Sequence, residues 1–351
     1  MTREGLHPGL AALLAAALLL PATAAAETII VDYDGVGSIY TRIQDGIDAA
    51  SDGDEVWVVS FISMSPVTFS GPGNTNLDLS GKNITIVATE GPVQTIIDCG
   101  GTDRAFIVGA GVDSTSRISG FTIQNGSAAD TGGAILCDGG SPRIEDCVFR
   151  GNSAPVGAAV KFSGGTTRVT GCAFYANTAA DRGGAICADD TQLTVSRCTF
   201  SDNEAHRGGG VALESSSLTA FRNTFANNLG AFGSSIFVDS STASVEQCVL
   251  AFGRASSPIS GGAPETFHSC IYGNASGDAL PGNAHDNINE DPLLCDLYAP
   301  SGGNMALCSN SPCLQSGNVW TLPIGSKAQG CGDCDSPVRD TTWGSIKALY
   351  R

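Results

Sequence analysis

The chain has 351 residues, of which 42% are hydrophobic, and a formal net charge of −17 at pH 7. This apolar share is enough to build a packed core, so a wholly disordered chain is excluded. The negative charge repels phosphate backbones, which excludes nucleic acid as a partner, and it disfavours polyanionic sugars unless Ca²⁺ bridges the two.

Residues 1–26 have the pattern of a signal peptide. An apolar run from Gly9 to Leu20 ends at Pro21, and three alanines, 24–26, precede Glu27. The run is too short to span a bilayer, and no later run of apolar residues is long enough either. We therefore expect an exported protein, secreted or associated with the outer membrane or cell surface, with no transmembrane span after signal removal.

Residues 27–55 are predicted to form a strand and a short helix. In "YTRIQDGIDAA", Ile43, Ile47 and Ala50 lie at positions i, i+4 and i+7, which puts them on one face of a helix. An open end of a repeat structure exposes apolar core and unpaired strand edges. We expect this helix to cap the repeat region that follows.

Residues 56–291 carry an internal repeat. Glycine-led phrases such as "GGAI" start at 132, 157, 183, 208 and 233, which are 25, 26, 25 and 25 residues apart. Each period contains short, β-branched, near-alternating segments separated by Gly, Asn, Asp and Ser, and no helical stripe. A fixed period of this kind predicts one coil per repeat, and stacked coils make a parallel β-helix.

Stacking places equivalent residues of successive coils in columns. Asn at a bend should form an amide ladder, and Cys147, Cys172 and Cys198 should be buried thiols acting as small hydrophobic groups. The predicted columns are Ile135, Val160, Ile186, Val211 and Ile236; Phe149, Phe174, Phe200 and Phe225; and Asn152, Asn177, Asn203 and Asn228.

The paired "GGAI" and "FxxN" phrases resemble the repeats of the chlamydial polymorphic outer-membrane proteins. More broadly, the chain resembles the right-handed parallel β-helix proteins of the pectate-lyase-like superfamily. The resemblance implies an all-β fold, a single right-handed solenoid of about 25 residues per rung. It covers adhesins and surface proteins as well as polysaccharide lyases and glycoside hydrolases, so it implies no single activity.

Residues 292–334 are predicted to be a Cys-rich C-terminal cap. Because disulfides are typical of exported chains, we expect them here; a Zn²⁺ site in the Cys308/Cys313 and Cys331/Cys334 pairs is the alternative. Residues 335–351 follow as a linker and tail, a possible sorting segment. The cysteines expected to form disulfides are Cys295, Cys308, Cys313, Cys331 and Cys334.

One cluster of side chains could support catalysis. The stacking places Asp181 one coil from His206, with Arg182 and Arg207 beside them, as a proton-transfer pair next to two cations. The plainer interpretation is an exposed, ion-paired turn, and we favour it. Ca²⁺ is a weaker possibility, because the following acidic turns match no known Ca²⁺ loop: Asp32 and Asp34, Asp52 and Asp54, Asp98 and Asp103.

The favoured function is therefore a structural or binding module, adhesin-like, that contacts glycans or protein partners of the envelope or extracellular space. No metal or organic cofactor is required by the sequence. A polysaccharide lyase or glycoside hydrolase is the alternative, and it needs a carboxylate or Ca²⁺ constellation that the sequence does not display.

Overall fold

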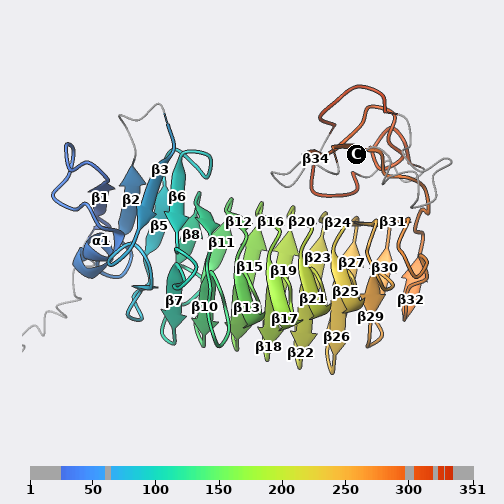
Figure 1. The fold of residues 1–351 in the computed structure, drawn as a ribbon, viewed down its shortest axis with the longest axis horizontal. Helices are drawn as coiled ribbons and strands as arrows, with labels where there is room; N and C mark the ends of the chain where they lie inside the picture. The colour runs from blue at the N-terminus through green and yellow to red at the C-terminus, as the bar shows by residue number, and fades with distance from the viewer. Residues whose placement is uncertain (1–24, 60–64, 297–303, 319–322, 328, 335–351) are drawn as a thin grey trace, which may run out of the picture.

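The computed structural model is an elongated stack of coils, and Figure 1 shows its strands stacked side by side along the long axis, each strand running across that axis. It describes residues 25–59, 65–296, 304–318, 323–327 and 329–334. The predicted signal peptide, apart from residues 25 and 26, and the predicted tail 335–351 lie outside the described residues.

Three long parallel sheets and one short parallel sheet form the walls of the solenoid. The eleven-stranded sheet contains β1 (Thr28–Asp32), β2 (Glu55–Val59), β5 (Thr85–Ala88), β8 (Arg117–Ser119), β11 (Arg143–Glu145), β15 (Thr166–Thr170), β19 (Gln192–Ser196), β23 (Ser217–Phe221), β27 (Thr242–Glu246), β30 (Glu265–Phe267) and β32 (Asn283–His285). The nine-stranded sheet contains β3 (Val67–Ser70), β6 (Thr95–Asp98), β9 (Thr122–Gln124), β12 (Val148–Arg150), β16 (Ala173–Tyr175), β20 (Thr199–Ser201), β24 (Thr224–Ala226), β28 (Val249–Ala251) and β31 (Cys270–Tyr272).

The remaining two walls complete each coil. The eight-stranded sheet contains β4 (Leu77–Asp78), β7 (Phe106–Gly109), β10 (Ile135–Asp138), β14 (Val160–Ser163), β18 (Ile186–Asp189), β22 (Val211–Glu214), β26 (Ile236–Asp239) and β29 (Ile259–Ser260). The four-stranded sheet contains β13 (Ser153–Val156), β17 (Thr178–Arg182), β21 (Glu204–Arg207) and β25 (Leu229–Phe232). The predicted solenoid of parallel strands is confirmed.

Phenylalanine rings stack along the core in the register that the repeat predicts. Phe149 faces Phe174 with ring centroids 4.7 Å apart, and Phe174 faces Phe200 at 4.8 Å. Phe225 continues the stack 4.5 Å from Phe200. All four side chains are fully buried, and Ile135 and its equivalents pair strand to strand in a second inward column.

An asparagine ladder closes one bend in four successive coils, those of Asn152, Asn177, Asn203 and Asn228. The backbone N–H and the side-chain Nδ2 of Asn152 both donate to Asn177 Oδ1, at 3.1 and 2.9 Å. Asn177 Nδ2 in turn donates to the Phe149 carbonyl at 3.1 Å and to Asn203 Oδ1 at 2.9 Å. Each buried amide therefore satisfies the turn of the preceding coil as well as its own neighbour.

The cysteine column also supplies hydrogen-bond acceptors for buried backbone N–H groups. The N–H of Cys147 donates to Cys172 Sγ at 3.4 Å, whereas the N–H of Cys198 donates to Asn223 Oδ1 at 2.9 Å. The N–H of Asn223 then donates to Cys248 Sγ at 3.3 Å. The position therefore needs an acceptor for a buried N–H, which a thiol and an amide both supply. The expected thiols are buried and free, but they are more than small hydrophobic groups.

The first glycine of the recurring phrase is required by the backbone. Gly183 has φ of +67°, and a Cβ added there would lie 2.4 Å from the Ile186 carbonyl oxygen. Gly132, Gly157, Gly208 and Gly233 share this left-handed conformation. Any side chain at this corner would both strain the backbone and collide with it.

The predicted N-terminal cap is confirmed as α1 (Ile43–Ala49). Ile43 and Ile47 are buried in the main core cluster. Gly46 lets the helix approach β1, because a Cβ there would lie 2.4 Å from Val31 Cγ2. The helix thus covers apolar core at the N-terminal end of the solenoid (Figure 1).

The C-terminal cap contains the antiparallel strands β33 (Leu294–Asp296) and β34 (Asn304–Leu307), and two disulfides, Cys295–Cys331 and Cys308–Cys334. The cap also contacts the nine-stranded sheet, where the Ser326 N–H donates to Thr224 Oγ1 at 2.9 Å. Figure 1 shows the segment above the C-terminal strands of that sheet. The cap therefore covers part of one outer face of the solenoid.

The expectation of a disulfide at Cys313 is wrong. This thiol is free and fully buried in an apolar cluster with Cys270, Leu307 and Ile324. It hydrogen-bonds the Cys270 thiol, and this contact together with burial raises the pKa of Cys270 well above its ordinary value. Spacing along the chain placed Cys313 among the cap cysteines, whereas packing turns it toward the solenoid.

Candidate functional site

The predicted cluster around Asp181 lies on the four-stranded sheet. Arg182 of β17 pairs in register with Arg207 of β21. Arg207 Nη1 lies 3.3 Å from Asp181 Oδ1, and Arg182 Nε lies 3.8 Å from Asp181 Oδ2. The structure therefore brings three of the four predicted residues together, as an acid between two guanidinium groups.

His206 does not join this group. Its ring is exposed and packs edge-on to Phe232, with centroids 5.2 Å apart. Within the described ranges, no hydrogen bond or ion pair links His206 to Asp181. The predicted proton-transfer pair is therefore not assembled, because Asp181 bonds the guanidinium of Arg207 and His206 turns to the next coil.

Three residues outside the predicted set of four extend the cluster onto the eight-stranded sheet. Lys161 of β14 is only 4% exposed and forms an ion pair with Asp189 of β18. Arg182 lies 3.7 Å from the same carboxylate and also pairs with Glu214 of β22. The register of the repeat places the two acids, Asp189 and Glu214, in one outward column with Ser163 and Asp239, whereas Lys161 lies in the neighbouring column.

The extended cluster balances its own charges. Each of its three cations, Lys161, Arg182 and Arg207, lies against a carboxylate of the same cluster. Cys187 lies beside Lys161, and burial raises the pKa of this thiol to about 12, so it stays protonated at neutral pH. The arrangement is typical of a structural ion-pair network and offers no unpaired cation for an anionic ligand.

A second polar surface runs along the nine-stranded sheet. Its strand register places Ser70, Asp98, Gln124, Arg150 and Tyr175 in one outward column across five consecutive coils. We call these five residues the polar row. At the ~4.8 Å spacing of paired strands, the row is about 19 Å long.

Hydrogen bonds fix the centre of the polar row. Arg150 Nε donates to Gln124 Oε1 at 2.7 Å, and Gln124 Nε2 donates to Asp98 Oδ2 at 2.6 Å. Tyr175 stands next to Arg150 and is partly exposed. The row thus presents an acid, an amide, a cation and an aromatic ring in a defined order.

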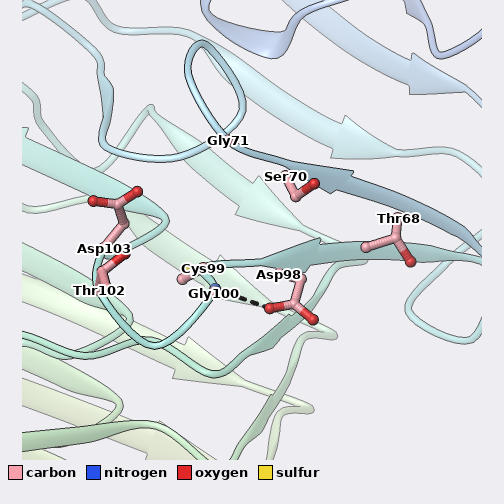
Figure 2. Close-up of a pocket in the computed structure, with 8 residues that line it drawn as sticks. All are labelled: Thr68, Ser70, Gly71, Asp98, Cys99, Gly100, Thr102 and Asp103. Atoms are coloured by element: carbon pink, nitrogen blue, oxygen red, sulfur yellow. Dashed lines mark hydrogen bonds between the residues drawn. The ribbon is translucent and has the colours of Figure 1, made fainter.

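A hollow of about 380 Å³ opens at the Asp98 end of the row. Figure 2 shows Asp98 and Asp103 at opposite ends of the short loop that bounds it, with Thr68 and Ser70 on the neighbouring strand. Thr75 Oγ1 and Asn76 Nδ2 donate to Asp103 at 3.1 and 3.0 Å. Gly71, Cys99, Gly100 and Thr102 complete the lining.

The Asp98 carboxylate is ionised. Partial burial raises its pKa, but hydrogen bonds from the Gly100 N–H, Gln124 and Asn125, with the charge of Arg150, outweigh burial and lower the pKa below its usual value. Its oxygens accept from Gly100 at 2.9 Å and from Asn125 at 3.1 Å. Asp98 is therefore a poor general acid, and its oxygens are occupied by amide groups.

Acidic side chains elsewhere accept hydrogen bonds from backbone N–H groups. Asp54 accepts the N–H groups of Glu27 and Ser51, both at 2.8 Å, and these bonds lower its pKa. Asp32 accepts the Gly37 N–H at 3.1 Å. In the part of the chain that the structure describes, the group of potential metal ligands that lie close together contains cysteines, not carboxylates.

The stacked parallel coils define a β-solenoid. The chain belongs to the right-handed β-helix family, since the family model for the right-handed β-helix region matches residues 45–250 and also 107–288, together more than half of the chain. No curated protein matches the chain significantly, and neither does any solved structure. The finer resemblance to polymorphic outer-membrane repeats and to the pectate-lyase-like superfamily stays a prediction. Across the described ranges, no helix has both the length and the apolar character needed to cross a bilayer.

Proposed function

We propose that this protein is an exported binding module that holds an extended, uncharged glycan along the polar row. The observation that carries the proposal is the hydrogen-bonded order of Asp98, Gln124 and Arg150, followed by Tyr175, on one flat outer face. The guanidinium of Arg150, which uses its Nε for the bond to Gln124, can donate to the hydroxyls of a sugar, and the ring of Tyr175 matches the apolar face of a sugar.

The ends of the row favour a ligand of defined length. The hollow beside Asp98 lies at one end of the row. Beyond Tyr175 the column continues to Ser201 and then Ala226, which is buried against Met305 of the cap. The open part of the sheet therefore lies between the hollow and the cap.

Charge favours a neutral polysaccharide over a polyanionic one. Within the row, the charges of Asp98 and Arg150 offset each other, and the chain as a whole carries a net charge of −17. A polyanion would meet this field without a surplus of cations to bind it. The two cap disulfides support the exported location, because such bonds are typical of proteins in oxidising compartments.

The test is retention of the protein on immobilised neutral polysaccharides, measured for the wild type and single variants. We expect Tyr175→Ala and Arg150→Ala to lower the affinity by about tenfold each, the loss of roughly one good contact. Arg168→Ala is the matched control, because Arg168 is an exposed arginine on the eleven-stranded sheet. Equal affinity for all variants would refute the proposal.

The same samples test the enzymatic alternative. Release of reducing or unsaturated sugar ends, with or without Ca²⁺, would assign the chain to the lyases or hydrolases instead. A requirement for Asp181 in that release would point to the ion-paired cluster, and a requirement for His206 would point to the exposed surface of the same four-stranded sheet. Retention without turnover is the result that we expect.

A further inference from the structure

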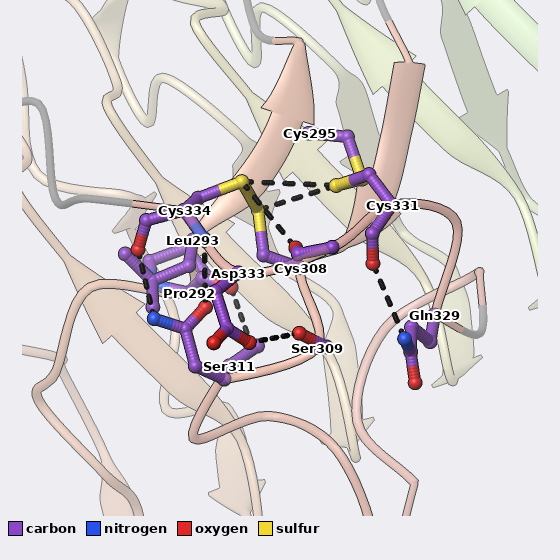
Figure 3. Close-up of a disulfide and its surroundings, with 12 residues drawn as sticks. Pro292, Leu293, Cys295, Cys308, Ser309, Ser311, Gln329, Cys331, Asp333 and Cys334 are labelled. Atoms are coloured by element: carbon purple, nitrogen blue, oxygen red, sulfur yellow. Dashed lines mark hydrogen bonds between the residues drawn. A yellow bond between two sulfur atoms is a disulfide. The ribbon is translucent and has the colours of Figure 1, made fainter.

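The cap brings four cysteine sulfurs into one cluster. Besides the bonds within each disulfide, Cys331 Sγ lies 3.4 Å from Cys308 Sγ and 3.7 Å from Cys334 Sγ. The sulfurs of Cys295, Cys308 and Cys331 all lie within 4.8 Å of one another. Figure 3 shows the two disulfides next to each other, and Cys334 reaches the other three sulfurs through its bond to Cys308 and its contact with Cys331.

Two of these distances, from Cys331 Sγ to Cys308 Sγ and to Cys334 Sγ, are close to those of a tetrahedral metal centre. Zn²⁺ bound by four thiolates has Zn–S bonds of about 2.3 Å, which puts neighbouring sulfurs ~3.8 Å apart. The contacts between the two disulfides already have nearly that length. We propose that Cys295, Cys308, Cys331 and Cys334 bind one Zn²⁺ ion when both disulfides are reduced.

Two of the ligands, Cys308 and Cys334, are also held by hydrogen bonds outside the disulfides. Asn310 holds Cys334 through two hydrogen bonds, accepting its N–H at 3.0 Å and donating to its carbonyl at 2.8 Å. The Cys308 N–H donates to the Leu293 carbonyl at 2.8 Å, across the β33–β34 hairpin. These contacts are independent of the sulfur oxidation state.

The loop from Gly330 to Cys334 is fixed against the hairpin in the same way. The Gly330 N–H donates to the Leu307 carbonyl at 3.0 Å, and the Ser309 N–H donates to the Gly332 carbonyl at 3.1 Å. A hairpin that supplies two ligands and a Cys-x₂-Cys turn that supplies the other two is a common way to build a structural zinc site. The ligand set replaces Cys313 of the sequence-based zinc alternative with Cys295, because Cys313 faces the solenoid.

The chemistry balances in two steps. A phosphine reductant and one water convert each disulfide to two thiols, and the phosphine becomes the phosphine oxide. Zn²⁺ then displaces four protons and forms a tetrathiolate complex of charge −2. Cys295, Cys331 and Cys334 are partly exposed, so reductant and metal can reach the cluster. Disulfide pairing and zinc binding exclude each other.

The experiment uses the full chain, reduced with a phosphine under inert gas, mixed with ZnCl₂ and desalted before its metal content is measured. We expect one zinc per reduced chain, less than one tenth of that in Cys331→Ser and Cys308→Ser, and none in the oxidised protein. Cys99→Ser is the control and should keep the full zinc content, because Cys99 is a buried, free cysteine outside the cluster. Circular dichroism shows whether each variant keeps its β structure.

Two measurements on the wild type keep the proposal falsifiable if a variant fails to fold. Zinc should protect Cys295, Cys308, Cys331 and Cys334 from an alkylating reagent, without changing the reactivity of the nine other cysteines. Co²⁺ in place of zinc should give the absorption of a tetrahedral tetrathiolate. Unprotected cap thiols, six-coordinate cobalt, or zinc content unchanged in Cys331→Ser would each overturn the proposal.

Discussion

Truncating one ring of the phenylalanine stack should destabilise the solenoid far more than truncating its outward neighbour. Phe174 is fully buried and has a parallel ring on each side, at 4.7 and 4.8 Å. Replacing a buried Phe with Ala costs about 3–5 kcal/mol, since contacts are lost and a cavity remains. With two stacked partners, we expect Phe174→Ala to lie at the upper end, about 4–5 kcal/mol.

The position within the stack provides a second, finer comparison. Phe225 has one ring neighbour, Phe200, and its other neighbour in the column is Leu250. An aromatic pair contributes about 0.5–1.5 kcal/mol beyond the area it buries. We therefore expect Phe225→Ala to be milder than Phe174→Ala by roughly that amount.

The assay is urea denaturation followed by circular dichroism, with native-state hydrogen exchange to report the stability of the individual coils. Exchange is needed because stacked repeats can open in parts, so one global transition need not describe them. Tyr175→Ala is the control and should cost less than about 1 kcal/mol, because its ring lies outside the core. Equal destabilisation by Phe174→Ala and Tyr175→Ala would refute the stacking argument.

Three further predictions follow from the bends and the polar row. Asn177→Ala should cost about 2–4 kcal/mol by chemical denaturation, because it orphans the buried N–H of Asn152; a loss below 1 kcal/mol would contradict the ladder. Gly183→Ala should cost at least about 2 kcal/mol, since its Cβ would strike the Ile186 carbonyl; an unchanged urea midpoint would contradict this. Asp98→Asn should lower the free energy of unfolding at pH 7 but not at low pH. Because the pKa of Asp98 is lower in the folded than in the unfolded chain, its ionised form stabilises the fold above the unfolded pKa of about 3.9. This stabilisation is lost as the pH falls through the pKa of the folded protein. A difference from wild type that persists at low pH would exclude this linkage.

Much of the fold was predictable because each coil repeats the same physical requirements. The repeat in the sequence predicts which residues share a column, and the pairing of Phe149 with Phe174 follows from the repeat alone. The role of the cysteine column was not predictable in the same way. Only the structure shows that Cys172 and Asn223 both accept a backbone N–H, a need that the hydrophobicity of a thiol conceals.

The polar surfaces were less predictable, because long side chains cross from one wall to another. The side chain of Arg182 extends from the four-stranded sheet to form an ion pair with Glu214 on the eight-stranded sheet. Aligning the repeats in columns does not predict an ion pair between two different sheets. The polar row was readable in principle, since Arg150 and Tyr175 directly follow the phenylalanines of the core column. The disulfide partners of the cap were not, because spacing does not reveal which way Cys313 faces.

The asparagine ladder also bears on how such a protein changes its length. The two interior asparagines of the ladder, Asn177 and Asn203, make equivalent side-chain bonds to the coil before and the coil after. If a segment of one period were duplicated in the middle of the ladder, the inserted coil would present side chains that are complementary to those of both neighbouring coils. The molecule would grow by about 4.8 Å, one strand spacing, and the contacts at the point of insertion would be replaced by equivalent ones. Genetic duplication of single coils would then set the length of the solenoid, while both caps stay the same.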